Sequence, residues 1–119
     1  MALNITTSRT DGVVAVSLSG VIYFGEESAS LRLLLKDLLN KSHQIVLDLK
    51  EVTHIDSGGL GTLVGLYASV RKAGGDLKLA NLGNHAHELL QITKLVTVFD
   101  VFDNAEDAIA SFDRATTAT

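Results

Sequence analysis

The chain has 119 residues, enough for one domain with its own core, and it lacks cysteine, which excludes disulfides, thiolate metal sites and cysteine nucleophiles. Fourteen acidic residues against ten scattered basic ones give a net charge of −4, which argues against a nucleic-acid partner. No apolar stretch is long enough to cross a bilayer, and residues 1–12 do not resemble a signal peptide. We therefore expect a soluble, cytoplasmic protein that does not insert into membranes.

The pattern of apolar residues divides the chain into strands and helices. A weakly alternating segment and a second strand-like segment flank the turn at residues 10–12, which predicts a hairpin. Leucines then recur at helical spacing, and the short apolar run over residues 45–49 is typical of a buried strand. In chain order we predict strands over residues 3–8, 13–18, 45–49, 77–80 and 97–99, and helices over residues of about 29–41, 58–73, 84–92 and 105–112.

Residue types at the helix ends support these boundaries. Gly74 and Gly75 are suited to end the second helix, and Asn84 and Asn104 are suited to cap the last two. Strands that alternate with helices imply parallel crossovers, and the opening hairpin makes the sheet mixed. We therefore predict an α/β fold. It has one domain over residues 1–113, with about four to five strands and about four helices, and a flexible tail at residues 114–119.

The segment HIDSGGLG, residues 54–61, lies between a predicted buried strand and a predicted helix. The first N–H groups of a helix have no partner within the helix, and together with the helix dipole they favour negative charge. Ser57 is expected at or just before the N-cap, with its hydroxyl facing outward, and the glycines let a bulky group approach the backbone. A phosphoserine there would suit the helix start but would be repelled by Asp56. Phosphorylation should therefore change the local field and leave the fold intact.

Simpler interpretations of the same segment stay open. Asp56 or Ser57 can be an ordinary helix cap, with the glycines forming a tight turn. No phosphate-binding loop or G-x-S-x-G motif is complete, and no third partner is evident for His54 beside Ser57, so we expect no catalytic residue and no cofactor. His85 and His87 lie two residues apart, which on a helix places them on different faces, so no metal site is expected.

Residues 56–61, DSGGLG, closely resemble the D-S-[S/T]-G-L-G signature of the STAS domain, the fold of bacterial anti-sigma factor antagonists. The similarity continues on both sides of the signature. Residues 16–20 resemble the strand that ends in the family's L-x-G, residues 45–49 the strand before the signature, residues 74–79 its G-G-x-L-x-L, and residues 94–108 its closing strand and E-x-A-containing helix. Such an ordered series is more specific than one short motif.

The resemblance implies a regulatory binding protein and not an enzyme. In this family the unphosphorylated antagonist captures an anti-sigma factor that is also a serine kinase. The kinase phosphorylates the first serine of the signature, which ends the capture, and a protein phosphatase resets the cycle. By position that serine is Ser57. The partner-binding residues expected around it are Asp56, Gly58, Gly59, Leu60, Gly61 and Leu63, together with Tyr23 and Phe24.

Two departures from the family pattern bear on the partner. Gly58 stands where the family usually has a second Ser or Thr, which could loosen the helix start by up to about 1 kcal/mol. The family commonly follows its L-x-G strand with Glu-x-Asp, whereas residues 21–24 here are apolar and aromatic. Tyr23 and Phe24 either anchor a different partner or pack under the first helix. The alternative function is a STAS scaffold without phosphorylation, or an accessory subunit of a membrane transporter.

Overall fold

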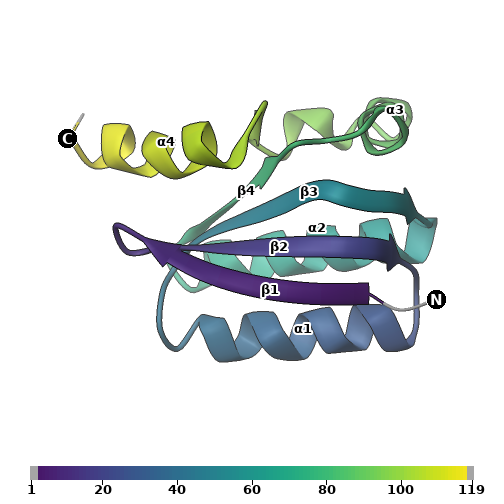
Figure 1. Cartoon of the computed structure of the whole chain (residues 1–119), viewed down its shortest axis with the longest axis horizontal. Coiled ribbons are helices and arrows are strands. Elements are labelled where there is room, and N and C mark those ends of the chain that lie inside the picture. Colours follow the sequence, from purple (N-terminus) through teal and green to yellow (C-terminus); the bar gives the residue numbers. More distant parts are fainter. Residues whose placement is uncertain (1–2, 118–119) are drawn as a thin grey trace.

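Five strands form one sheet in the computed structural model, which describes residues 3–117 (Figure 1). The elements in chain order are β1 (Leu3–Thr10), β2 (Val13–Ile22), α1 (Glu26–Leu38), β3 (Gln44–Ile55), α2 (Ser57–Lys72), β4 (Asp76–Ala80), α3 (Asn84–Ile92), the short 3₁₀ helix η1 (Leu95–Thr97), β5 (Val101–Phe102) and α4 (Ala105–Thr117). The strands lie side by side in sequence order; β1 and β2 are antiparallel, and every later pair is parallel. The predicted α/β class with a mixed sheet is confirmed.

Helices cover both faces of the sheet, which explains why its central strand is apolar along several consecutive residues. Neighbouring residues of β3 point to opposite faces. Ile45 belongs to the large cluster that includes the buried leucines of α1 and α2, whereas Val46 packs with Ala108 and Phe112 of α4. Figure 1 accordingly shows α1 and α4 on opposite sides of the sheet. A strand that is covered on both faces has a continuous run of hydrophobic residues, and this confirms the buried strand predicted at residues 45–49.

A buried lysine joins α4 to the sheet. Lys78 of β4 is only 6% exposed. Its Nζ donates a hydrogen bond to Ser111 Oγ at 2.8 Å, lies 4.5 Å from the centre of the Phe112 ring and is 3.9 Å from the exposed Asp100 carboxylate. A buried charge is tolerated when such partners replace water, so this ammonium group ties the last helix to β4.

The predicted strand at residues 97–99 is wrong. Residues 95–97 form η1 instead, after Lys94 adopts a left-handed conformation with φ of 61°. Phe99 is buried against Tyr67 of α2, with ring centres 5.2 Å apart, so the apolar character of this segment reflects packing rather than strand pairing. The last strand, β5, follows at Val101–Phe102 and pairs with β4.

Several element boundaries differ from the predicted ones. β2 continues through Gly20 to Ile22, and β3 continues past Leu49 to Ile55, because the two strands pair along that whole length. Gly83, and not Asn84, is the N-cap of α3, whereas Asn104 does cap the following turn by accepting the Asp107 N–H at 2.8 Å.

The C-terminal helix α4 runs to Thr117, beyond its predicted end at Phe112. Residues 118 and 119 lie outside the described part of the chain, so the flexibility of residues 114–119 stays a prediction.

Candidate functional site

Asp56 is the N-cap of α2 and lies at the end of β3. Its backbone is extended, with φ of −88° and ψ of 175°, and its Oδ1 accepts the Gly59 N–H at 2.6 Å. Ser57 is therefore the first helical residue and not the cap, which corrects its expected position. The capping interpretation of the segment holds for Asp56, whose short carboxylate reaches the third N–H of the helix in the usual way.

The Ser57 side chain is exposed at this helix start. Within residues 3–117 its hydroxyl makes no hydrogen bond, because the neighbouring Asp56 already satisfies the N–H of Gly59. The N–H groups of residues 57 and 58 belong to the first turn, which has no partner inside the helix and attracts negative charge. A reactive group that approaches from solvent can reach this hydroxyl without disturbing a structural contact.

Asp56 also joins α2 to the end of β2, a role that the sequence did not reveal. Its carboxylate accepts the Phe24 N–H at 3.1 Å and 3.3 Å through its two oxygens. Its own N–H donates to the Ile22 carbonyl at 3.3 Å. The segment that precedes α1 is thereby fixed against the start of α2, although 32 residues separate Phe24 from Asp56 in the chain.

The glycines of the signature serve different purposes. A Cβ at Gly59 would overlap with the Ile22 carbonyl, and a Cβ at Gly58 would overlap with the Cβ of Phe24, so both positions require glycine for close packing. Gly61 is exposed, and a Cβ there would meet nothing within 4 Å. Only Gly61 therefore lies on open surface, whereas Gly58 and Gly59 hold the β2–α1 segment against the helix.

The predicted partner-binding side chains separate into buried and exposed groups. Leu60 is 5% exposed and Leu63 is 1% exposed, so both belong to the core. The structure thus places both among the core side chains and not on the exposed surface, and their contact with a partner stays a prediction. Tyr23 is half-buried, with its carbonyl accepting the Ser28 hydroxyl at 2.7 Å. Phe24 is 72% exposed, so it does not pack under α1.

Two histidines lie near the same end of the sheet. The rings of His54 and His85 are tilted with centres 5.5 Å apart, and His85 Nε2 lies 3.4 Å from the Ile55 carbonyl. In the part of the chain that the structure describes, no three His, Asp or Glu side chains come together as a metal ion would require.

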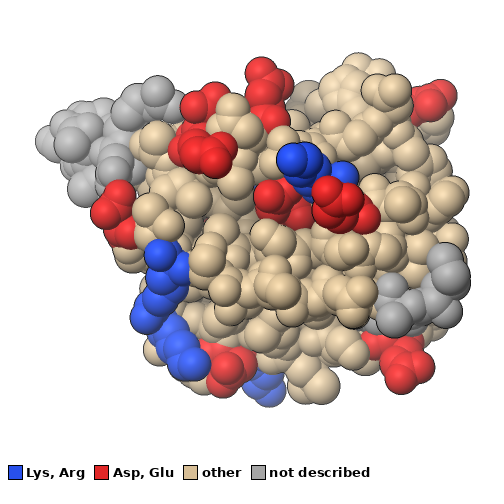
Figure 2. Space-filling model, viewed as in Figure 1, with Lys and Arg blue, Asp and Glu red and all other residues tan. Residues whose placement is uncertain are grey.

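Basic side chains lie at the other end of the molecule, where α1 ends beside the β1–β2 turn and Arg9 donates to the Lys41 carbonyl (Figure 2).

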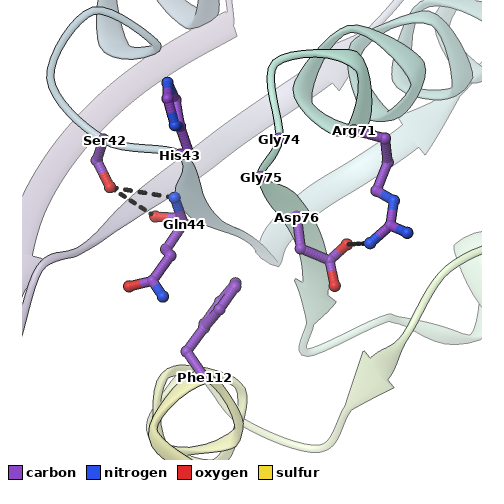
Figure 3. Close-up of a pocket in the computed structure, with 8 residues that line it drawn as sticks. All are labelled: Ser42, His43, Gln44, Arg71, Gly74, Gly75, Asp76 and Phe112. Atoms are coloured by element: carbon purple, nitrogen blue, oxygen red, sulfur yellow. Dashed lines mark hydrogen bonds and ion pairs between the residues drawn. The ribbon is translucent and has the colours of Figure 1, made fainter. Parts of the chain in front are cut away.

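A hollow of about 470 Å³ lies at the ends of β3 and β4 where these strands begin, opposite to the end that carries Ser57 (Figure 3). Its two charged side chains pair with each other, Arg71 Nη1 lying 3.7 Å from Asp76 Oδ1. The Ser42 hydroxyl likewise bonds locally, accepting the Gln44 N–H at 3.1 Å. Because these polar groups already have partners within the chain, the exposed segment around Ser57 is the stronger candidate site.

Comparison with known proteins identifies the family of the chain. The STAS domain model matches residues 4–108. The anti-sigma-B factor antagonist of Bacillus subtilis is 31% identical over 109 residues, covering 92% of this chain and 99% of its own. The crystal structure of an anti-sigma factor antagonist from Mycobacterium paratuberculosis superimposes with a TM-score of 0.78 at 23% identity, over 92% of this chain and 93% of that one.

A transporter-related protein has the same fold. The crystal structure of a sulfate transporter family protein from Wolinella succinogenes gives a TM-score of 0.77 at 22% identity, over 92% of this chain and 91% of that one. Among the described residues of the present chain, no helix has the length and apolar character needed to cross a membrane. Because the domain model covers nearly all of the sequence and includes the segment around Ser57, the chain belongs to the STAS domain family.

Proposed function

We propose that the chain is an anti-sigma factor antagonist of the cytoplasm, a regulatory binding protein whose partner is an anti-sigma factor with serine kinase activity. The observation that carries the proposal is the exposed Ser57 hydroxyl at the first position of α2, free of internal hydrogen bonds within residues 3–117. The name of the Bacillus subtilis relative, an anti-sigma-B factor antagonist, supports it. The unphosphorylated chain captures the partner, and phosphorylation of Ser57 releases it.

The phosphorylation step uses the partner's nucleotide. The Ser57 oxygen forms a bond to the γ-phosphorus of ATP while the bond from that phosphorus to its bridging oxygen breaks. ADP leaves, and the hydroxyl proton passes to a base of the kinase. The chain supplies only the acceptor and its position, and it catalyses nothing. A protein phosphatase that hydrolyses the phosphate ester restores the hydroxyl and the capture.

Release follows from charge at the contact surface. A phosphoserine carries about −1.5 to −2 charges, which the N–H groups of the first turn of α2 partly offset. The exposed Asp56 carboxylate stands next to it in sequence, so the surface becomes strongly negative. The partner buries this surface when the chain is unphosphorylated. After phosphorylation, binding would require removal of water from the new charges, and this desolvation weakens the complex. We place Tyr23, Phe24 and Gly61 in the contact surface with Asp56 and Gly58.

The test is a phosphorylation assay with the purified anti-sigma factors of the same organism. Each is mixed with the chain, ATP and Mg²⁺, and the products are mapped by peptide mass spectrometry. We expect phosphate on Ser57 in the wild-type chain and none in Ser57→Ala. Ser69→Ala is the matched control, because Ser69 is an exposed serine of the same helix that lies away from its start. Phosphate at another residue, or none with any of these factors, would refute the switch.

A second candidate function is a STAS scaffold without phosphorylation, or an accessory subunit of a membrane transporter. The apolar and aromatic residues at 21–24 favour it, because the family's antagonists commonly carry acidic residues after the same strand. The two functions differ in one measurable respect. A scaffold would bind its partner equally well with Ser57 or with Ser57→Asp, whereas an antagonist would lose its partner on that substitution.

A further inference from the structure

Phe24 combines an exposed side chain with a fixed backbone. It is 72% exposed, although it is a large aromatic residue. Its N–H is held by both oxygens of the Asp56 carboxylate at 3.1 Å and 3.3 Å. Two residues earlier, the Ile22 carbonyl accepts the Asp56 N–H at 3.3 Å. The ring is therefore carried by a segment that is anchored on both sides of Tyr23 and does not need to be ordered when a partner binds.

The Phe24 side chain packs directly against Gly58 of α2. A Cβ at residue 58 would overlap with the Cβ of Phe24 and would come within 2.9 Å of its Cγ and 3.0 Å of its Cδ1. The base of the phenyl ring thus lies directly against the second residue of α2, next to Ser57. The two departures from the family pattern, at residue 58 and at residues 21–24, therefore meet at one contact, because a side chain at residue 58 would overlap with the Phe24 Cβ.

We propose that Phe24, packed against Gly58, is the aromatic anchor by which this chain selects its partner. The partner carries an apolar socket for the Phe24 ring, next to the part of the partner that approaches Ser57. This inference rests on the proposed function, because it concerns the same protein partner. Aromatic residues with a rigid backbone are common at the centres of interfaces, where they bury much area at little entropic cost. A socket for a phenyl ring also excludes partners whose surface at this point is charged.

The socket explains how one phosphate could act on the complex. Burial of the Phe24 ring removes water from the adjacent surface, and Ser57 precedes the glycine against which the ring lies. A phosphate at residue 57 would be placed at the edge of an apolar contact, where charge is poorly solvated. Partner choice and partner release would then depend on neighbouring residues of one small surface.

The test measures affinity for the purified anti-sigma factor that binds the unphosphorylated chain, by titration calorimetry. We expect Phe24→Ala to weaken binding by about 10-fold or more, with an unchanged melting temperature, and Phe24→Tyr to restore most of it. Gly58→Ser should also weaken binding, because it displaces the ring. Leu33→Ala and Ile92→Ala are the controls, since these apolar side chains are 70% and 72% exposed on other helices, and both should bind like the wild type.

The outcomes separate this inference from the proposed function. Wild-type affinity in Phe24→Ala, with release still caused by Ser57→Asp, would overturn the anchor and leave the antagonist function in place. A loss that Leu33→Ala reproduces would also overturn it, because any exposed apolar side chain would then have the same effect. Failure of the wild-type chain to bind any anti-sigma factor of the organism would overturn the proposed function together with the anchor.

Discussion

The Phe24 N–H lies 3.1 Å from one carboxylate oxygen of Asp56 and 3.3 Å from the other, and this contact joins the end of β2 to the start of α2. The same carboxylate caps the helix through Gly59. One acidic residue therefore sets the position of both segments that flank Ser57. Its replacement should affect the whole site, whereas replacement of Ser57 itself should affect only the surface chemistry.

Asp56→Ala removes the helix cap and the acceptor of the Phe24 N–H. We expect it to lower the free energy of unfolding by about 1–3 kcal/mol. Asp56→Asn, which keeps an acceptor oxygen, should lose less. The measurement is urea unfolding followed by circular dichroism, with Ser57→Ala as the control that should change stability little. Equal stability of Asp56→Ala and the wild type would mean that the cap contributes nothing to the folded state.

Ser57→Asp places a negative charge at the exposed first position of α2. The melting temperature should stay nearly unchanged, because the hydroxyl makes no internal hydrogen bond among the described residues and helix starts favour negative charge. Binding to the anti-sigma factor should weaken at the same time. Differential scanning fluorimetry and calorimetric titration of the same preparation check both expectations. A large drop in melting temperature would identify Ser57 as a structural residue.

Gly58→Ala tests the contact between residue 58 and Phe24 through stability alone. Alanine in a helix is favoured over glycine by up to about 1 kcal/mol, but its Cβ would overlap with the Phe24 Cβ. We expect a net loss of about 1–2 kcal/mol in the wild-type background. Because Phe24→Ala keeps its Cβ, the loss should persist there, whereas in Phe24→Gly the same substitution should stabilise the chain.

Chemical denaturation of the wild type, the three single variants and the two double variants provides this measurement. A stabilising Gly58→Ala in the wild-type background would show that the helix start moves freely away from Phe24. The close contact between residue 58 and Phe24 would then be absent in solution.

Lys78 offers a test of how α4 is attached. Lys78→Met replaces the ammonium group by an unbranched apolar side chain that is one atom shorter, and Ser111 retains the Ala108 carbonyl as acceptor at 2.7 Å. We expect a change in stability within about 1 kcal/mol, of either sign, because an apolar residue of similar shape removes the desolvation of a buried charge. Lys78→Ala should cost about 2–3 kcal/mol, since it leaves a cavity under the helix.

Thermal unfolding of these two variants distinguishes packing from charge. Lys41→Ala is a suitable control, because the Lys41 side chain is 60% exposed. If Lys78→Met were as destabilising as Lys78→Ala, the ammonium group and its hydrogen bond to Ser111 would be the main attachment of α4, contrary to our expectation.

Local patterns predicted the elements whose signals lie within a few residues. Helical spacing of leucines gave α1, the apolar run at residues 45–49 gave the buried part of β3, and Asn104 was recognised as a cap from its residue type. The second half of β3 was missed, because it owes its strand conformation to pairing with residues 19–22 of β2, where Glu51 pairs with Ser19 and His54 with Val21. At residues 97–99 a strand was predicted that does not form, because the apolar Phe99 packs against Tyr67 and does not pair with a strand.

The sequence by itself determined the order of strands and helices, the family signature and the choice of Ser57 as the residue of interest, because these depend on residue types at short and regular spacing. The tertiary structure decided which signature residues are accessible: Leu60 and Leu63 enter the core, and Phe24 remains exposed. It also decided that Phe24, Asp56 and Gly58 form one unit. Contacts between segments 32 residues apart arise from strand pairing and helix packing, and no local pattern encodes them.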